Sequence, residues 1–485
     1  MLPQTLSREG NRGPVRGGVS VESVIRGIEK SKEHSVRLLE EFLRIPSIST
    51  DADHQKDVLR AAEYLAGVMR ESGVPGVEIL PTDGHPIVYG EWCERPDAPT
   101  LLIYGHYDVQ PVTDPSIWTS PPFEPAFRDG KIWARGATDD KGQLLVHVLA
   151  AREHLKANGS LPVNVKFLFE GEEEIGSEHL DAFLRENTGK LACDAVVISD
   201  TAMFAPGVPS ICTGLRGIAY VEFTLRGASA DMHSGSFGGG VDNPALALSR
   251  VLAGLKDAET GRILVDGFYD EVEEPSDEEK RGWSELPHSD EDFREMTGVP
   301  RLYGESGRTT LERLWSRPTL DVNGIWGGFT GEGSMTVLPA RASAKVSMRL
   351  VPGQDPAVIV RRLRKHLEEH LPSTVVLEEF QELHGGKPWI ATQDHPAVQA
   401  AFAAVEKGFG TAPVATREGG SIPIVHSFAE ILSAPVVLMG IGLHDEGAHG
   451  PDEHLDLANY QAGIRSAAHL LSEVAVTLGS VPGRG

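Results

Sequence analysis

The stretch LLIYGHYDVQPVTDPSIWTSPPFEPAFRDGKIWARGATDDKG, residues 101–142, decides the fold. Its apolar start, residues 101–104, predicts a buried strand that a glycine ends. His106 and Asp108 follow two positions apart, and in extended chain that spacing turns both side chains the same way. Taken alone, a His-x-Asp pair is more often a surface turn than a pair of ligands.

A second strand-like run, residues 131–134, precedes Asp139 and Asp140. Adjacent aspartates alone are usually a solvated turn or a helix cap. An imidazole at one strand end and carboxylates beyond another are, however, typical of a ligand or metal site in an α/β protein. The choice between these interpretations depends on whether the rest of the chain supplies further ligands.

Composition excludes several classes of protein. A chain of 485 residues with 40% hydrophobic residues is long enough for two or three domains, and no run approaches the ~20 apolar residues of a membrane span. The formal net charge of −25 argues against nucleic acid and is compatible with binding cations. Three scattered cysteines and an N-terminus without an apolar signal favour a reducing cytoplasm.

The order of predicted elements gives the fold class. Strands alternate with helices up to about residue 212 and again beyond 385, which predicts an α/β domain with a mixed, largely parallel sheet. Between these two parts, the predicted strands alternate apolar and polar residues, as half-buried antiparallel strands do, so this segment is predicted to be an α+β module. The expected division is a disordered tail at 1–20, the α/β domain at 21–212 and 385–485, and the module at 213–384, with a loop-rich insertion at about 256–318.

Further candidate ligands follow buried strands. They are His106, Asp139, the run Glu172–Glu174, Asp200 and His449. Each has an ordinary explanation alone, such as an acidic helix start or a turn cap. Their joint recurrence after strands indicates an N/O site for Zn²⁺ or Mn²⁺, with enough carboxylates for two ions about 3.5–4 Å apart.

Several ordered motifs resemble one enzyme family. They are GHYDVQP, WARGATDDKG, EGEEEIGS, ISD, DMHSGSFGG, REGGSIP and HGPDE, spread over residues 30–470. The chain resembles the co-catalytic dinuclear metallopeptidases, which include aminoacylases, glutamate carboxypeptidase and succinyl-diaminopimelate desuccinylase. Within that family it is most similar to the branch of carnosine dipeptidase and cytosolic nonspecific dipeptidase. The resemblance implies a catalytic domain interrupted by a lid and dimerisation domain.

The resemblance also implies the metal ligands. His106 and Asp200 would bind one ion, Glu174 and His449 the other, and Asp139 would bridge both. For the last ligand, His444 is a rival five residues earlier, but only His449 precedes Pro and Glu at the family's offsets. The motif departs from the family in carrying Asp452 where Asn is usual. His384, His426 and His454 are interpreted as structural or surface residues.

Other roles follow from the same resemblance. Asp108 would orient His106, and the Asp139–Asp140 peptide bond would be cis. In EGEEEIGS, Glu173 falls on the general base, which leaves Glu172 as an extra surface acid. Metal-bound hydroxide would attack the scissile carbonyl while Glu173 carries the proton to the leaving amine.

The module carries the remaining implied residues. His233 resembles a histidine that reaches across a homodimer to polarise the reacting oxygen, so the active site would be completed in trans. Thr336, Arg349 and Ser421 match a clamp for the substrate's C-terminal carboxylate, a group that a guanidinium binds bidentately.

The expected function is a metal-dependent dipeptidase that acts on dipeptides or short peptides with a free C-terminus. One alternative is an N-acyl-amino-acid deacylase of the same family, and another is a non-catalytic family scaffold. The intact ligand set and Glu173 argue against the scaffold. The sequence leaves open the native metal, the preferred side chains and the role of residues 256–318.

Overall fold

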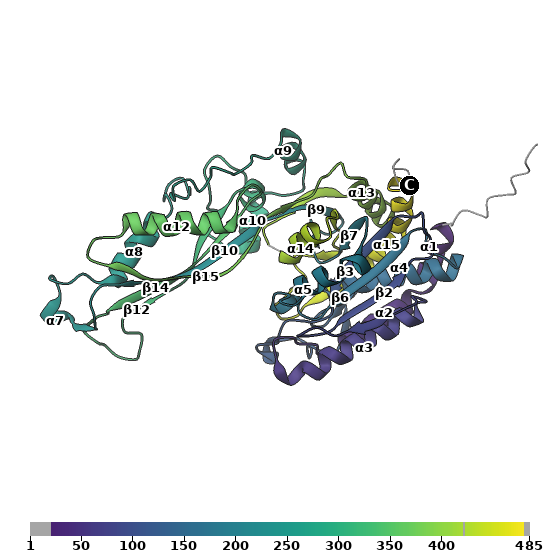
Figure 1. Cartoon of the computed structure of the whole chain (residues 1–485), viewed down its shortest axis with the longest axis horizontal. Coiled ribbons are helices and arrows are strands. Elements are labelled where there is room, and N and C mark those ends of the chain that lie inside the picture. Colours follow the sequence, from purple (N-terminus) through teal and green to yellow (C-terminus); the bar gives the residue numbers. More distant parts are fainter. Residues whose placement is uncertain (1–20, 421, 480–485) are drawn as a thin grey trace, which may run out of the picture.

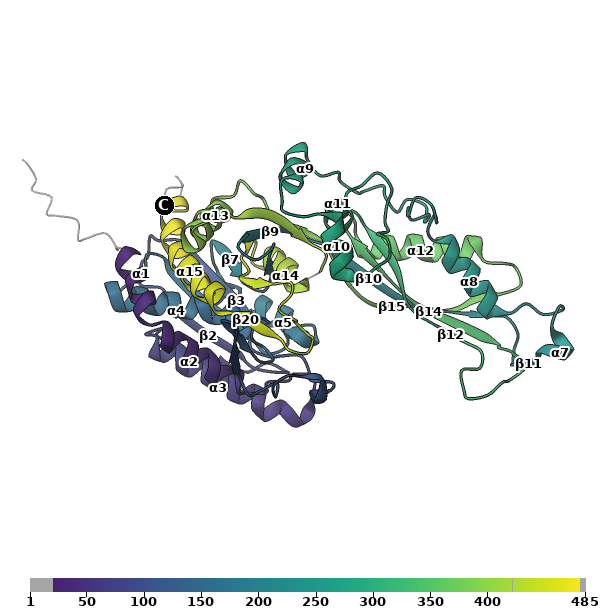
Figure 2. The same cartoon turned by 180° about the vertical axis from the view of Figure 1, so that it is seen from behind.

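A computed structural model describes residues 21–420 and 422–479, so the predicted tail at 1–20 and Ser421 lie outside the described residues. Two bodies lie side by side along the long axis of the molecule (Figures 1 and 2). Within the described chain, no helix is long and apolar enough to span a membrane.

The larger body is built on a nine-stranded sheet in the order β1-β2-β6-β3-β7-β18-β9-β16, with β17 beside β9. The strands are β1 (Glu78–Leu80), β2 (Ile87–Trp92), β3 (Thr100–His106), β6 (Asn164–Glu170), β7 (Ala195–Ile198), β9 (Ser210–Leu215), β16 (Trp389–Ile390), β17 (Val414–Glu418) and β18 (Val436–Leu438). The predicted α/β class with a mixed sheet is confirmed. Parallel pairing runs through the centre, β6-β3-β7-β18, and joins β17 to β9, whereas the outer pairs are antiparallel.

Helices bury both faces of this sheet. One face is covered by α1 (Val21–Lys30), α2 (Lys32–Leu43), α3 (Gln55–Glu71), α4 (Lys141–Asn158), α13 (Pro396–Phe409) and α15 (Leu457–Thr477), and the other by α5 (Leu180–Glu186) and α14 (Pro423–Ile431). In β3, Leu101 and Ile103 pack on the first face, while Leu102 and Tyr104 pack on the second. The unbroken apolar run of β3 is therefore explained by burial on both sides.

The smaller body is an antiparallel sheet in the order β12-β14-β10-β15. Its elements are β10 (Gly217–Arg226), α8 (Pro244–Gly254), β12 (Thr319–Gly327), β14 (Arg341–Leu350), α12 (Pro356–His370) and β15 (Val376–Gly386). Both helices pack on one face around a separate hydrophobic core. The sequence analysis missed β12, since most of its side chains are exposed and no clean alternation marks it. We propose the expected domain boundaries near residues 213 and 384, which fall near the ends of β9 and β15. The chain passes between the two bodies at Arg216, between β9 and β10, and at residues 387–388, between β15 and β16.

Short elements complete the chain. They are β4 (Ala126–Arg128), β5 (Lys131–Trp133) and β20 (His454–Asp456), which form a small sheet, together with β8 (Ala202–Met203), β19 (Gly442–Leu443), β11 (Met232–His233), β13 (Val337–Leu338), α6 (Thr188–Leu191) and α7 (Ser234–Phe237). The end of the module that carries β11 and α7 points away from the large sheet (Figures 1 and 2).

The insertion at 256–318 is folded rather than a loop. It contains α9 (Asp277–Ser284), α10 (Asp290–Thr297) and α11 (Thr310–Trp315), each opened by a serine or threonine N-cap. Trp283 and Trp315 form its small core. The Arg417 side chain of β17 lies over the Trp283 ring, 5.4 Å from its centroid, and pairs with Glu279. This insertion, expected to be loop-rich, therefore turns one side of α9 toward the large sheet.

Candidate metal centre

The candidate ligands gather where the central parallel strands end. His106 is the last residue of β3, and Asp200 lies two residues beyond β7. Glu174 follows β6, His449 lies between β19 and β20, and Asp139 lies between β5 and α4. Parallel strands bring their carboxyl ends to one edge of a sheet, so residues far apart in sequence meet there.

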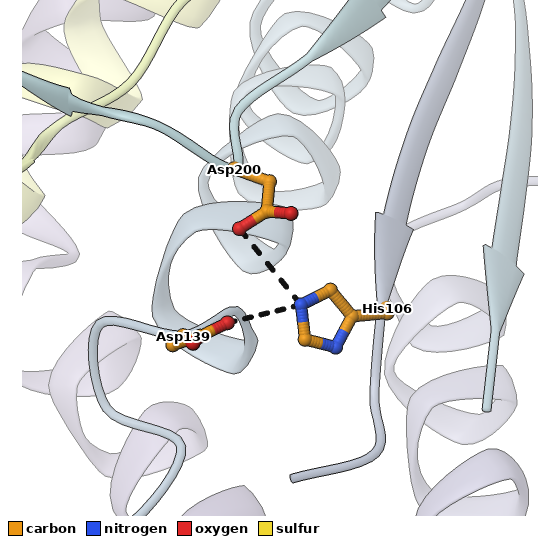
Figure 3. A group of neighbouring side chains, drawn as sticks. All are labelled: His106, Asp139 and Asp200. Atoms are coloured by element: carbon orange, nitrogen blue, oxygen red, sulfur yellow. Dashed lines mark hydrogen bonds and ion pairs between the residues drawn. The ribbon is translucent and has the colours of Figure 1, made fainter. Parts of the chain in front are cut away.

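The first group is His106, Asp139 and Asp200 (Figure 3). The Nε2 atom of His106 lies 3.1 Å from Oδ1 of Asp139 and 3.9 Å from Oδ1 of Asp200. The His106 side chain is fully buried, so its ring has a fixed environment. The two carboxylates and the imidazole point toward one another from three different segments of chain (Figure 3).

The second group is Asp139, Glu174 and His449. The Nε2 atom of His449 lies 3.0 Å from Oδ2 of Asp139 and 3.3 Å from Oε2 of Glu174. Two ligands bound about 2.1 Å from a tetrahedral Zn²⁺ lie ~3.4 Å apart, so these separations fit a shared ion. Each oxygen of Asp139 belongs to a different group, an arrangement that suits a carboxylate joining two cations.

Burial and mutual contacts shift the pKa values of these groups. Burial raises the pKa of the Asp200 carboxyl to about 6 and, against the opposing effect of His106, raises the pKa of Glu173 well above its ordinary value. Burial disfavours a charged His106, but hydrogen bonds to its neighbouring aspartates outweigh burial and raise its pKa. Hydrogen bonds to Asp139 and Glu174 raise the pKa of His449 to about 10. Cations bound here would replace protons as the partners of the acids.

Asp108 and Gln110 hold two of the candidate ligands, His106 and Glu174, by hydrogen bonds. The Nδ1 atom of His106 lies 3.2 Å from the backbone oxygen of Asp108 and 3.4 Å from its carboxylate. The same carboxylate accepts a hydrogen bond from the backbone N–H of Glu174, and the Gln110 side chain donates to Oε2 of Glu174 at 2.7 Å. Sequence reasoning missed Gln110, although it lies in the motif GHYDVQP.

Glu453 is a second residue to which sequence reasoning gave no role. It is fully buried, and Arg135 donates to its Oε2 at 2.7 Å. The backbone N–H groups of Gly136, Thr138 and Asp139 donate to the same carboxylate at 3.0, 3.1 and 3.2 Å. One carboxylate thus fixes the loop that presents Asp139. The offset of Glu453 from His449 within HGPDE was the signal that could have found it.

Two further predictions concern the same loops. The peptide bond between Asp139 and Asp140 is cis, as the resemblance implied. The prediction that Glu172 is a surface acid is wrong, because its side chain is buried. It accepts hydrogen bonds from the backbone of His85 at 2.9 Å and from the ring of His179 at 2.9 Å. A charged side chain reaches this depth only with such partners.

A cavity of about 280 Å³ opens beside the ligands. Its walls include Asp139, Asp200, Ala202 and His444. His444, the rival for the last ligand, therefore lies near the centre, but the second ligand group contains His449. The cavity gives a small substrate access to the edge of the centre.

The module residues lie in two separate places. Oγ1 of Thr336 is 3.5 Å from Nε2 of the exposed His233, at the end remote from the large sheet (Figure 2). Arg349 lies near the other end of the ten-residue strand β14, opposite Ile218. At about 3.3 Å per residue, that strand spans ~30 Å. Within one chain, His233 and Thr336 are thus far from Arg349, and Ser421 lies outside the described residues.

We expect Glu453→Gln to weaken metal binding by about 10- to 100-fold. An amide places an NH₂ group against donors that now face a carboxylate oxygen, so the Asp139 loop loses its fixed position. Metal content after dialysis against graded concentrations of free Zn²⁺ measures the effect. Asp452→Asn is the matched control, because Asn keeps the acceptor for the Thr119 N–H and restores the family's residue. Equal affinity in both variants would contradict the role of Glu453.

Metal affinity should rise with pH through the neutral range. In metal-free protein the raised pKa of His449, about 10, keeps its ring protonated at pH 7. A cation must displace that proton, so affinity increases by up to about tenfold per pH unit for each proton released. Calorimetric titration in buffers of different ionisation enthalpy counts the released protons. A metal affinity that stays constant from pH 6 to 8 would show that metal binding releases no proton from His449.

Similarity to known proteins extends over most of the chain. The model of "Peptidase family M20/M25/M40" matches residues 102–473. A "Cys-Gly metallodipeptidase" of Schizosaccharomyces pombe is 34% identical over 94% of this chain and 99% of that protein. The human "Beta-Ala-His dipeptidase" is 32% identical over 94% of this chain and 93% of that protein.

Solved structures agree with this assignment. The structure of the dipeptidase Dug1p from Saccharomyces cerevisiae is 31% identical and superimposes with a TM-score of 0.79, covering 96% of this chain and 99% of that one. An M20 family metallo-carboxypeptidase from Sulfolobus solfataricus is 34% identical with a TM-score of 0.80, covering 91% and 99%. A family match over most of the chain, with the candidate centre inside it, identifies the chain as a member of peptidase family M20/M25/M40.

Proposed function

We propose that this chain is a dinuclear metal-dependent dipeptidase for dipeptides or short peptides with a free C-terminal carboxylate. The observation that carries the proposal is the pair of ligand groups that share Asp139, with Glu173 beside them. The names of the similar yeast and human enzymes support a dipeptide substrate. An imidazole and carboxylate ligand set without cysteine suits Zn²⁺ or Mn²⁺.

When bound, the two cations would supply Lewis-acid activation of water and of the scissile carbonyl. The chain's own residues do the rest. Glu173 accepts the proton of the attacking water and delivers it to the leaving amine. Its buried setting, which raises its pKa, favours a carboxyl group that holds that proton between the two steps. Asp108 keeps His106 oriented throughout.

The substrate's carboxylate is held by Thr336, Arg349 and Ser421, and His233 polarises the reacting oxygen. Support for a contribution in trans comes from distance. His233 is the last residue of β11, which lies with α7 at the end of the module remote from the large sheet (Figure 2), and Thr336 lies beside His233. A homodimer in which each module reaches the partner's centre brings all four together. The two ends of one module then serve two different active sites.

The module also has an exposed apolar surface that suits a partner copy. Edge strand β12 exposes Val322, Ile325 and Trp326, and α8 exposes Leu246 at 56%. Exposed apolar side chains grouped on an unpaired strand edge mark an interaction surface. As part of the same proposal we assign the enzyme to the cytoplasm, on the evidence of its free cysteines, of which Cys93 is exposed.

A carboxypeptidase acting on longer peptides is a second candidate, favoured by the similar Sulfolobus structure. An N-acyl-amino-acid deacylase is a third, from the same chemistry. A panel with Zn²⁺ or Mn²⁺ separates them: free dipeptides, tripeptides, N-acetylated dipeptides and N-acyl amino acids. The proposal predicts the highest kcat/KM on free dipeptides. Cleavage of N-acyl amino acids alone would refute it.

We expect Glu173→Gln to lower kcat by about 10²- to 10⁴-fold, because the amide cannot accept the proton. Metal content should stay at two ions per chain. Stopped assays on a free dipeptide, with metal analysis of the same sample, measure both. Glu178→Gln, at an exposed position nearby, is the control and should keep full activity. Turnover by the Glu173 variant at the wild-type rate would exclude Glu173 as the base.

Mixing two inactive variants tests the contribution in trans. A mixed dimer of His233→Ala with Glu173→Gln contains one centre with an intact Glu173 and the partner's His233. Random exchange of subunits should therefore restore about a quarter of wild-type activity. Each variant mixed with itself is the control. If the mixture stays inactive although exchange is shown by mass spectrometry, His233 acts in its own chain or not at all.

A further inference from the structure

Arg216 links the inserted module to the loop after β17. It stands between β9 and β10, and its backbone N–H donates to the oxygen of Glu418 at 3.2 Å. Its Nε donates to the backbone oxygen of Gly419 at 3.1 Å. A Cβ at position 419 would lie 2.5 Å from Nη2 of Arg216, so only glycine lets the guanidinium come this close.

This loop borders the metal centre. The side chain of Glu418 accepts a hydrogen bond from the backbone of Ala202, which lies two residues beyond the candidate ligand Asp200. Ala202 and Asp200 both line the cavity of about 280 Å³. The end of β17 and the loop after it therefore contact both Arg216 and the wall of the cavity that a substrate would enter.

The Nη1 atom of Arg216 is buried and has no hydrogen-bond partner among the described residues. The residue as a whole is only 9% exposed. Burial and the neighbouring Arg349 lower the pKa of Arg216 to about 10. A buried N–H group without an acceptor calls for an explanation in a native protein, and a bound anion is one such explanation.

Strand register places Arg349 on the same side of the small sheet. Arg349 is opposite Ile218 in β10, and Arg216 stands two residues before Ile218, so both side chains project from one face. The other face is the one covered by α8 and α12. Near the arginines, register adds to this face Asp321, which is 61% exposed and 3.5 Å from Lys256. Farther along the same face, Glu222 lies opposite Lys345 and 3.5 Å from its Nζ. Positive charge thus exceeds negative charge here, in a chain of net charge −25.

We propose that Arg216 and Arg349 together form the site for the substrate's C-terminal carboxylate, with Arg216 as a specificity-determining residue that the free Nη1 equips to bind a carboxylate oxygen. This rests on the proposed peptidase function and adds a residue to it. Two guanidinium groups can engage both oxygens of one carboxylate, whereas a neutral carboxamide offers a single weaker acceptor. Arg216 therefore selects substrates with a free C-terminus.

The test compares a dipeptide with its C-terminal amide in wild type, Arg216→Gln, Arg216→Lys and the control Arg361→Gln, an exposed arginine on α12. Arg216→Gln is expected to raise KM for the dipeptide by about 10- to 100-fold with kcat within about threefold, and to leave kcat/KM for the amide unchanged. Arg216→Lys should keep part of the affinity for the dipeptide, because an ammonium group keeps the positive charge but cannot bind a carboxylate bidentately as a guanidinium does. The control should match wild type.

An equal loss on the acid and the amide would overturn the proposal, because it would mean that Arg216 only braces the Gly419 loop. No change on either substrate would overturn it too. If Arg216→Gln does not purify folded, Arg216→Lys carries the same comparison, with a smaller rise in KM still confined to the acid. Calorimetric binding of the dipeptide to Glu173→Gln, with and without Arg216→Gln, gives a readout without turnover. Wild type that binds but does not cleave would refute the proposed function alone.

Discussion

The candidate metal centre brings like charges together against their mutual repulsion. Asp139, Glu174 and Asp200 point their carboxylates into one small volume at the edge of the large sheet. Two unit charges 4 Å apart near a protein surface repel by about 4 kcal/mol, so three such groups are not held together without positive partners. In metal-free protein the protonated rings of His106 and His449 supply part of that charge, and bound divalent cations would supply it in their place. The metal centre is thus part of the electrostatic balance of the fold.

More buried acids surround this centre than the ligands alone. Burial raises the pKa of Glu170 to about 8 and those of Glu446 and Glu453 to about 7. Each is held by donors from its own surroundings, as the Tyr104 hydroxyl holds Glu170 at 2.5 Å. These acids attract cations to the region, and their hydrogen bonds fix the loops that carry the ligands. The module adds the opposite charge, in Arg216 and Arg349, where a substrate's carboxylate would arrive.

The central part of the fold could be predicted from the sequence because its signals are local. The apolar run at residues 101–104 predicts a buried strand, and the candidate ligands follow such strands. The edge strand β12 could not be predicted, because most of its side chains are exposed and its sequence shows no alternation of apolar and polar residues. The folded insertion could not be predicted either, because Trp283 meets Trp315 and Arg417 only in the tertiary fold. Glu172 was misjudged for a similar reason, as its partners His85 and His179 are not its neighbours in an extended chain.

The most direct test of the account is anomalous diffraction from crystals grown with Zn²⁺ or Mn²⁺, recorded at the metal's absorption edge. Two peaks are expected about 3.5–4 Å apart, one on each side of the Asp139 carboxylate. His106 and Asp200 should contact the first ion, and Glu174 and His449 the second, at about 2.0–2.2 Å. A single peak, or ions bound away from Asp139, would contradict the central claim.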